Sequence, residues 1–338
     1  MIQQQSPEQI ISLNIPKQGL PVTIITGFLG SGKTTLLNYI LSNNDDFKIA
    51  VLVNEFGDID IDSQLLVSVD ENMVTLSNGC ICCTINDDLI EAVYQVLELD
   101  EKVDYLIVET TGLADPLPIA LTFLSTELRD LVRLDSILTL VDAETFTSEH
   151  FESESALKQI IYGDIILVNK TDLVAPNKIK LLEKDIQTIK VGARILHSQY
   201  GKVPLPLILD LGICNQSLFS QKIEGDHHHD HDHEHHHSHH LEIDGFVAVS
   251  FESDRPFHLD KFQNFLSDKK LNNVFRAKGI IWFIESELRH IFQLSGKRYD
   301  IDADKWQGIR RNQLVLIGRD LNASEIRQGL EQCLVKNF

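Results

Sequence analysis

The sequence predicts an α/β fold in which a mostly parallel sheet is covered by helices, followed by a smaller α+β domain. Short apolar, β-branched runs alternate with amphipathic helical patterns from residue 22 to about residue 196. Parallel strands that are buried on both faces have this pattern. The chain has 338 residues, 43% of them hydrophobic and 24% charged, and a His-rich segment interrupts the alternation. This length is too great for one typical domain and sufficient for two ordinary soluble ones.

Each expected strand of the first unit is a near-continuous apolar run. These runs are residues 22–26, 49–53, 104–109, 136–141, 164–169 and 193–196. Helical patterns lie between them, and the clearest are residues 34–41, 87–99 and 179–189. Their periodicity of about 3.6 residues indicates helices that pack one face on the sheet.

The second unit begins after the His-rich segment. Residues 245–253 alternate as a half-buried strand does, and residues 277–284 and 312–318 are further strand candidates. Residues 322–335 predict a closing helix, with Asn322 as its N-cap and Glu325 three residues later. We therefore divide the chain into an N-terminal extension (1–20), an α/β domain (21–215), a linker (216–243) and an α+β domain (244–338).

Charge and targeting signals narrow the class of protein. The formal net charge is −20, which disfavours nucleic acid or an anionic membrane as a partner. No apolar run approaches the roughly 18–20 residues that span a bilayer, and residues 1–19 lack the features of a signal peptide. We therefore expect a cytoplasmic protein whose thiols stay reduced.

Residues 27–34, GFLGSGKT, match the phosphate-binding pattern G-x-x-x-x-G-K-[ST] at every fixed position. The pattern follows an expected strand and opens an expected helix, which is the context that the motif requires. Backbone N–H groups of the loop surround the β-phosphate, Lys33 reaches the β- and γ-phosphates, and the Thr34 hydroxyl is a Mg²⁺ ligand. The residues expected to bind the nucleotide here are Gly27, Gly30, Ser31, Gly32, Lys33, Thr34 and Thr35.

A second motif, NKTD at residues 169–172, follows a later strand of the same sheet. The Asp172 carboxylate can accept hydrogen bonds from N1–H and the 2-amino group of guanine, whereas adenine has no 2-amino donor. Asn169, Lys170 and Asp172 therefore predict that the nucleotide is GTP rather than ATP.

A Mg²⁺–nucleotide site needs an acidic residue at the carboxyl end of a strand. Glu109, in ETTG, meets this condition, and Asp142 at the end of the neighbouring strand is the rival, with capping of the next helix as its alternative role. Asp104 begins the same strand as Glu109 and belongs at the opposite edge. Gly112 is placed to offer its N–H to the γ-phosphate. No glutamine or arginine is positioned by the sequence to orient the attacking water, so we expect slow intrinsic hydrolysis.

Three thiols lie within four residues, at Cys80, Cys82 and Cys83, and the chain has five cysteines in all. An odd number argues against a disulfide framework, and clustered thiolates suit Zn²⁺, Cu(I) or iron–sulfur clusters. Three sulfurs leave a fourth position open, as suits an ion that is passed on. Two alternatives stay open: a buried structural role for the thiols, or a redox dithiol. Glu55 and Asp60 are candidate oxygen ligands.

The His-rich segment holds ten of the fourteen histidines at residues 226–240. Neutral imidazoles bind Zn²⁺, Ni²⁺, Cu²⁺ or Co²⁺, so the segment either gathers metal for the thiols or serves as a passive spacer. In the second unit, Arg276 and Lys278 either contact the first domain or a client protein, or are solvated.

With these motifs in place, the chain resembles the CobW-type GTPases, the cobalamin-synthesis and zinc-chaperone family related to the hydrogenase and urease nickel-insertion GTPases. The matching stretches are residues 27–35, 54–62, 78–83, 109–116, 169–172, 245–257 and 275–283. The resemblance implies a metal-responsive GTPase that uses GTP and Mg²⁺ and delivers a metal to a client metalloprotein. It leaves open whether the metal is Zn²⁺, Co²⁺ or Ni²⁺, and whether the protein is a homodimer.

Competing functions are a metal buffer in which GTP binding is vestigial, a cobalt chaperone for cobalamin synthesis and an activator of nitrile hydratase. A P-loop kinase for a small molecule is a further class, against which the guanine-type NKTD and the thiol cluster argue.

Overall fold

A computed structural model of the chain describes residues 19–43, 47–53, 75–76, 85–99, 102–147, 150, 153–210, 246–306 and 308–336. The chain divides into two compact units. The N-terminal unit comprises Lys17–Leu211 with Ser295–Arg298. The described residues before and after Ser295–Arg298, from 246 to 294 and from 299 to 336, belong to the C-terminal unit. The domain boundaries that we placed at residues 215 and 244 fall outside the described residues and stay a prediction.

The N-terminal unit is built on a seven-stranded sheet in the order β3-β2-β4-β1-β5-β6-β7. Every pairing recorded among its described residues is parallel. The strands are β1 (Leu20–Gly27), β2 (Ile49–Val53), β3 (Thr75–Leu76), β4 (Tyr105–Glu109), β5 (Val132–Asp142), β6 (Ile165–Asn169) and β7 (Arg194–His197). The predicted α/β class with a parallel sheet is confirmed.

Helices cover this sheet because its strands are apolar on both faces. β1, β2, β4 and β6 are buried at every residue, as expected for parallel strands with helices on both sides. The helices of the unit are α1 (Lys33–Ser42), α3 (Ile85–Leu97), α4 (Pro116–Phe123), α6 (Glu154–Tyr162), α7 (Pro176–Ile189) and α8 (Leu205–Ile208), with a 3₁₀ turn η1 (Thr171–Leu173).

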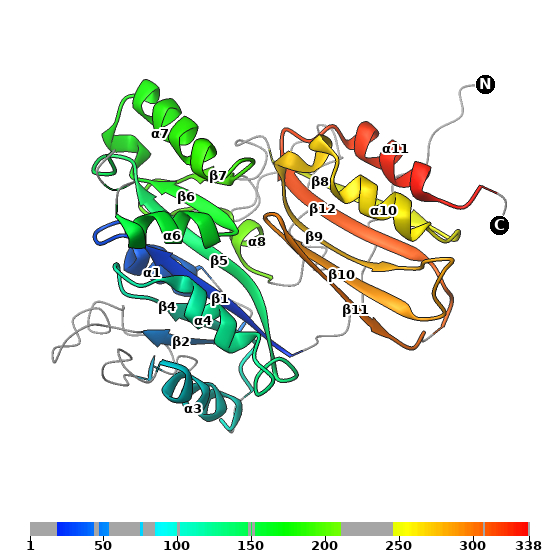
Figure 1. The fold of residues 1–338 in the computed structure, drawn as a ribbon, viewed down its shortest axis with the longest axis horizontal. Coiled ribbons are helices and arrows are strands. Elements are labelled where there is room, and N and C mark those ends of the chain that lie inside the picture. Colours follow the sequence, from blue (N-terminus) through cyan, green and yellow to red (C-terminus); the bar gives the residue numbers. More distant parts are fainter. Residues whose placement is uncertain are drawn as a thin grey trace, which may run out of the picture. The chain divides into compact units, whose positions relative to one another are not determined.

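α3, α4, α6 and α7 are neighbours in that order (Figure 1). α3 and α4 pack on a cluster that includes Val22 and Ile24 of β1, while α6 and α7 pack on Ile166 and Val168 of β6. Two of these helices, α4 and α6, are additions to the predicted ones. Each has a local start signal: Asp115 accepts a hydrogen bond from Leu117 N ahead of α4, and Ser153 caps α6.

The C-terminal unit is a five-stranded sheet in the order β11-β10-β9-β12-β8, with antiparallel pairing of β12 to both β8 and β9. Its strands are β8 (Phe246–Ser253), β9 (Val274–Ile281), β10 (Arg289–Ser295), β11 (Arg298–Asp304) and β12 (Asn312–Arg319). Its helices are α10 (Leu259–Leu266) and α11 (Ala323–Cys333), with a 3₁₀ turn η3 (Lys269–Asn273). The predicted α+β architecture is confirmed.

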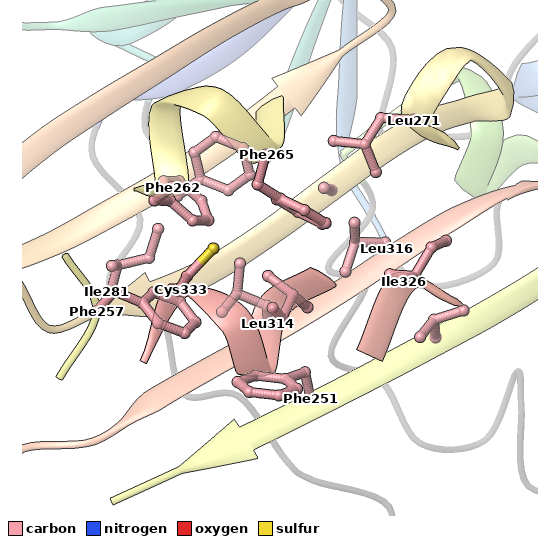
Figure 2. Packing of buried hydrophobic residues seen from close by; sticks show 14 of the residues in the cluster. Phe251, Phe257, Phe262, Phe265, Leu271, Ile281, Leu314, Leu316, Ile326 and Cys333 are labelled. Atoms are coloured by element: carbon pink, nitrogen blue, oxygen red, sulfur yellow. The ribbon is translucent and has the colours of Figure 1, made fainter. Parts of the chain in front are cut away.

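The core of this unit lies where α10 and α11 pack on the sheet. Figure 2 shows Phe262 and Phe265 of α10 together with Leu314 and Leu316 of β12 and Cys333 of α11. Phe262 is fully buried and stacks on Phe257 with ring centroids 5.5 Å apart. Offset aromatic packing of this kind adds about 0.5–1.5 kcal/mol beyond area burial. Among the described residues, no helix is long and apolar enough to cross a membrane.

Candidate functional site

The carboxyl ends of the parallel strands bring the predicted motifs to one edge of the sheet. Gly27 ends β1, and Lys33 begins α1. Gly27 and Gly32 have φ angles of 143° and 99°, a region that residues with a side chain rarely adopt. A Cβ on Gly32 would collide with the side-chain amide of Asn169. Glycine at position 32 therefore lets the phosphate loop pack directly against the end of β6.

The side chain of Lys33, which follows the phosphate loop, reaches back to the start of that loop. Its ammonium donates to the carbonyl oxygens of Gly27 at 3.1 Å and Phe28 at 3.4 Å, and the residue is 8% exposed. A buried ammonium needs such acceptors. This position keeps the charge within the loop, where phosphate oxygens can bind it.

Thr34 and Glu109 lie together, as the sequence led us to expect. Thr34 Oγ1 donates to Glu109 Oε1 at 3.1 Å, and Glu109 is 2% exposed. The oxygens of a hydroxyl and a carboxylate are hard ligands of the kind that Mg²⁺ binds alongside substrate phosphates. The residues present therefore fit a Mg²⁺–nucleotide. Asp104, at the other end of the strand, accepts from Lys48 N at 3.2 Å and belongs to the opposite edge.

Two further polar atoms at this edge have no hydrogen-bond partner within the part of the chain that the structure describes. Ser31 Oγ and Thr111 Oγ1 are buried, with no hydrogen-bond partner among the described residues. A buried hydroxyl without a partner costs about 1–3 kcal/mol, so such atoms mark a place where a ligand can supply one. Both hydroxyls belong to the loops that follow β1 and β4.

Asp142, the rival acid, is engaged elsewhere. One of its oxygens accepts from Glu144 N at 2.8 Å, and the other pairs with Lys170 Nζ at 2.7 Å. Burial alone would raise the pKa of the Asp142 carboxyl, but the hydrogen bonds from Lys170 and from the backbone of Glu144 and Thr145 outweigh it and lower that pKa. Asp142 is thus an ionised partner of the NKTD motif and closes the turn after β5.

Asn169 joins three segments of the site. Its Nδ2 donates to Ser31 O at 3.0 Å, while its Oδ1 accepts from Ser198 Oγ at 2.9 Å and from Gly201 N at 3.1 Å. Lys170 follows in the left-handed region at φ 59°. This backbone turn places Asp172 in η1 on the surface, where the residue is exposed.

The loop after β7 was absent from our predicted site. Ser198 O accepts from both Thr171 N at 3.2 Å and Thr171 Oγ1 at 3.1 Å, and Tyr200 beside it is 67% exposed with φ 55°. One signal could have found it, because polar residues after a strand next to the NKTD strand must lie at the same edge.

The ETTG loop packs against the phosphate loop. Thr110 N donates to Ile25 O at 2.9 Å, and a Cβ on Gly112 would lie 2.7 Å from Leu29 N. Only glycine permits this approach. The structure therefore brings Gly112 beside the loop predicted to hold the phosphates.

The residues predicted to bind the transferred metal lie outside the described residues. These are Cys80, Cys82, Cys83, Glu55 and Asp60, together with the His-rich residues 226–240. Within the described part of the chain, no group of three or more His, Cys, Asp or Glu side chains could hold a metal ion. The described cysteine, Cys333, is buried in the C-terminal unit, which raises the pKa of its thiol to about 11.

Comparisons with known proteins match both units. The description "CobW/HypB/UreG, nucleotide-binding domain" fits residues 21–197, and "Cobalamin synthesis protein cobW C-terminal domain" fits residues 246–334. "Zinc-regulated GTPase metalloprotein activator 1" of Dictyostelium discoideum is 33% identical and aligns over 94% of this chain and 80% of its own. "Zinc chaperone YjiA" of Escherichia coli is 33% identical and aligns over 91% of this chain and 96% of its own. The crystal structure of the Zn(II)-bound YjiA GTPase of E. coli is 27% identical, with TM-score 0.43, covering 94% of this chain and all (100%) of that one.

Proposed function

The chain belongs to the CobW/HypB/UreG family of P-loop GTPases, and on that basis we propose that it hydrolyses GTP to GDP and phosphate to deliver a zinc ion to a client metalloprotein. The main support for GTP binding is that Thr34, Glu109 and Asn169, from three separated segments, come together at one edge of the sheet. The relatives named as zinc chaperones and as zinc-regulated GTPase activators support the metal half.

The phosphates are bound by the loop between β1 and α1. Its backbone N–H groups and the N-terminus of α1 favour negative charge, and Lys33 supplies a full positive charge there. Ser31 Oγ and Thr111 Oγ1 gain the partners that they lack among the described residues. Thr34 and Glu109 hold Mg²⁺, which neutralises charge on the phosphates when it is bound.

The base is read by the NKTD segment. Asp172 accepts from N1–H and the 2-amino group of guanine, while Asn169 keeps the segment fixed to the phosphate loop through Ser31 O at 3.0 Å. Lys170, held by Asp142, presents its aliphatic stem beside the base. ATP leaves the Asp172 carboxylate without these donors.

The γ-phosphate is sensed at Gly112. In this proposal its N–H donates to a γ-phosphate oxygen, while its carbonyl oxygen accepts a hydrogen bond from Gln159 of α6. Loss of the γ-phosphate on hydrolysis removes this contact, which makes the ETTG loop the part of the described site that differs between the GTP and GDP states.

The cargo is bound by the thiolates of Cys80, Cys82 and Cys83, with Glu55 as a candidate oxygen ligand. Zinc bound to structural sites is held by about 10–16 kcal/mol, so release needs a change that weakens the site. In the sequence the thiols lie between NEFG at residues 54–57 and the ETTG strand, which is the basis for coupling them to the nucleotide. The His-rich residues 226–240 then gather zinc for the thiols.

Two alternatives make different predictions. A metal buffer with vestigial GTP binding keeps its full activity in vivo when Lys33 is replaced, whereas a GTP-driven chaperone loses it. A cobalt chaperone for cobalamin synthesis requires that Co²⁺ rather than Zn²⁺ alters GTP hydrolysis.

The proposal is tested by measuring GTP hydrolysis by the full chain as Zn²⁺ is titrated. We expect zinc to change kcat of the wild-type protein and to leave kcat of Cys82→Ser unchanged. Cys333→Ala is the matched control, because Cys333 lies in a separate core, and it should respond to zinc as the wild type does. A kcat that zinc does not alter in the wild type would refute the coupling, and absence of guanine-nucleotide binding would refute the GTPase.

A further inference from the structure

Helix α6 contacts the ETTG loop through one buried side chain. Gln159 Nε2 donates to Gly112 O and to Ala114 O, each at 3.1 Å, and the residue is 1% exposed. Both partners are carbonyl oxygens, which only accept hydrogen bonds. The amide nitrogen of Gln159 must therefore be the end that faces the loop, and its two N–H groups are both used.

Gln159 is itself held in place by β5. Its main-chain carbonyl oxygen accepts from Thr139 Oγ1 at 2.6 Å, and the neighbouring Ala156 and Ile160 are buried in the cluster shared with β6 and α7. The helix is thus fixed to the sheet by both a hydrogen bond and apolar packing. A side chain on so constrained a backbone has little freedom to follow a movement of the loop.

The other side of the loop is bounded by the phosphate loop. Leu29 N and Leu29 Cδ2 would lie 2.7 and 2.6 Å from a Cβ on Gly112. Just before this point, Thr110 is hydrogen-bonded to β1 through Ile25 O, at 2.9 Å. Gly112 therefore lies between Leu29 on one side and Gln159 on the other.

We propose that Gln159 is a positioning residue for the γ-phosphate: by holding the carbonyls of Gly112 and Ala114, it fixes the direction in which Gly112 presents its N–H. This inference rests on the proposed function, in which that N–H contacts the γ-phosphate. Glycine has no side chain to restrict φ and ψ, so the direction of its N–H depends on what holds the peptides around it. Thr110 holds the chain before Gly112, and Gln159 holds the peptide after it.

A neighbouring ion pair also joins α6 to Asp115, the residue after Ala114. Lys158 pairs with Asp115 at 3.1 Å and with Glu154 at 2.8 Å. Lys158 is partly exposed, so its ion pairs contribute little to stability. The buried Gln159 amide is the contact whose loss removes a hydrogen bond from each of the two carbonyl groups.

The consequence is selective for the triphosphate. GDP has no γ-phosphate, so its affinity does not depend on the direction of the Gly112 N–H. GTP binding and hydrolysis depend on that direction, because a hydrogen-bond donor that is already in place needs no reorganisation as negative charge develops on the phosphate in the transition state. A merely structural Gln159 would affect both nucleotides alike, through stability.

The test compares Gln159→Leu, which keeps the size and removes both donors, with Thr139→Val, which removes a buried hydrogen bond on the same helix without touching the loop. For each full-length protein we would measure the Kd of GDP, the Kd of a non-hydrolysable GTP analogue and kcat. We expect Gln159→Leu to bind GDP within about twofold of the wild type but the analogue about three- to tenfold more weakly, as the loss of one or two hydrogen bonds predicts. Its kcat should fall at least as far, and Thr139→Val should change the two affinities equally.

A second variant, Gln159→Glu, makes the contact itself depend on pH, and its affinity for GDP at the same pH values is the control for a change in stability. An ionised carboxylate would face two carbonyl oxygens, whereas the protonated form can donate one hydrogen bond to them. Burial raises the pKa of such a carboxyl, so affinity for the analogue, relative to the wild type, should recover as the pH is lowered from 8 to 6.

The inference would be overturned if Gln159→Leu lowered the affinities for GDP and for the analogue equally. It would also be overturned if the affinity of Gln159→Glu for the analogue did not depend on pH. Either result would leave the proposed GTPase function intact. If the wild-type protein binds no guanine nucleotide, the proposed function fails and this inference fails with it. The wild-type measurement separates the two cases.

Discussion

Thr34 Oγ1 donates to Glu109 Oε1 at 3.1 Å, joining the first turn of α1 to the last residue of β4. The two residues are 75 positions apart in the chain and lie together because β1 and β4 are parallel neighbours whose carboxyl ends meet at one edge. This relationship is the basis for proposing that Glu109 would hold Mg²⁺ rather than Asp142, which pairs with Lys170.

Replacement of Glu109 tests that assignment. Glu109→Gln keeps the shape and removes one negative charge beside the cation, so the Mg²⁺ concentration for half-maximal hydrolysis should rise about tenfold or more. Asp142→Asn is the matched comparison, and it should leave the Mg²⁺ dependence unchanged while weakening nucleotide binding through Lys170. The reverse pattern, with Mg²⁺ dependence following Asp142, would mean that the wrong acid has been assigned.

Asp172 is predicted to set the choice of base. Xanthine carries a carbonyl where guanine carries its 2-amino group, so Asp172→Asn offers an N–H donor to xanthine and loses the acceptor for guanine. We expect GTP affinity to fall about 10- to 100-fold, as the loss of hydrogen bonds to a charged group implies, and xanthosine triphosphate affinity to rise. Competition binding with GTP, XTP and ATP measures this, and an unchanged order of preference would exclude Asp172 as the base-reading residue.

The ion pair between Asp142 and Lys170 predicts a pH dependence of stability. The pKa of Asp142 is lowered in the folded protein from its ordinary value of 3.8. Its contribution is therefore complete well above pH 3.8 and is lost as the pH falls through the lower folded value. Asp142→Asn should unfold more easily at pH 7, by about 1.5–3 kcal/mol, and should lose less stability than the wild type between pH 4 and pH 3. Denaturant unfolding at several pH values measures both slopes, and parallel curves for the two proteins would contradict the pairing.

Cys333 is predicted to be unreactive in the native state. Burial raises the pKa of its thiol to about 11 from an ordinary value of 9.0. The thiolate is the nucleophile, so alkylation at pH 8 should be about 100-fold slower than in the unfolded chain. Site-resolved mass spectrometry after iodoacetamide treatment reports this rate. Labelling as fast as in denaturant would show that the thiol is accessible and would remove Cys333 as a control for the zinc site.

Much of the sheet could be predicted because buried parallel strands leave a plain pattern. The run at residues 49–53 has the same bounds as β2, Ile49–Val53, since every side chain in it is apolar. The cap of α11 was also readable: Asn322 Oδ1 accepts from Glu325 N at 3.2 Å, as the spacing predicted.

Polar residues that are buried by pairing were not predictable in this way. β5 begins at Val132, earlier than the predicted strand at 136–141, because Arg133 is paired with Asp210 at 2.6 Å and lies 3.6 Å from Asp135. Because Arg133 and Asp135 are charged, a search for apolar runs assigns this segment to the surface. β11 was missed for a different reason, since it lies at the edge of its sheet and most of its residues are exposed.

Sequence reasoning named site residues where a short motif contains them, and it missed a contact between distant segments. Lys33, Thr34 and Asn169 follow from short patterns. Gln159 is a single glutamine in an amphipathic helix, and its role depends on carbonyl groups of Gly112 and Ala114, 47 and 45 residues earlier in the chain. No spacing in the sequence reports that contact.

The most direct test of the central claim is the affinity for Zn²⁺ of the full chain, measured once with GDP bound and once with a non-hydrolysable GTP analogue. If zinc and the γ-phosphate are coupled, each must alter the affinity for the other by the same factor, and coupling of this kind is typically about 5- to 150-fold. We predict a difference of about fivefold or more between the two nucleotide states, abolished in Cys82→Ser. Equal zinc affinities in both states would contradict a GTP-driven transfer of the metal.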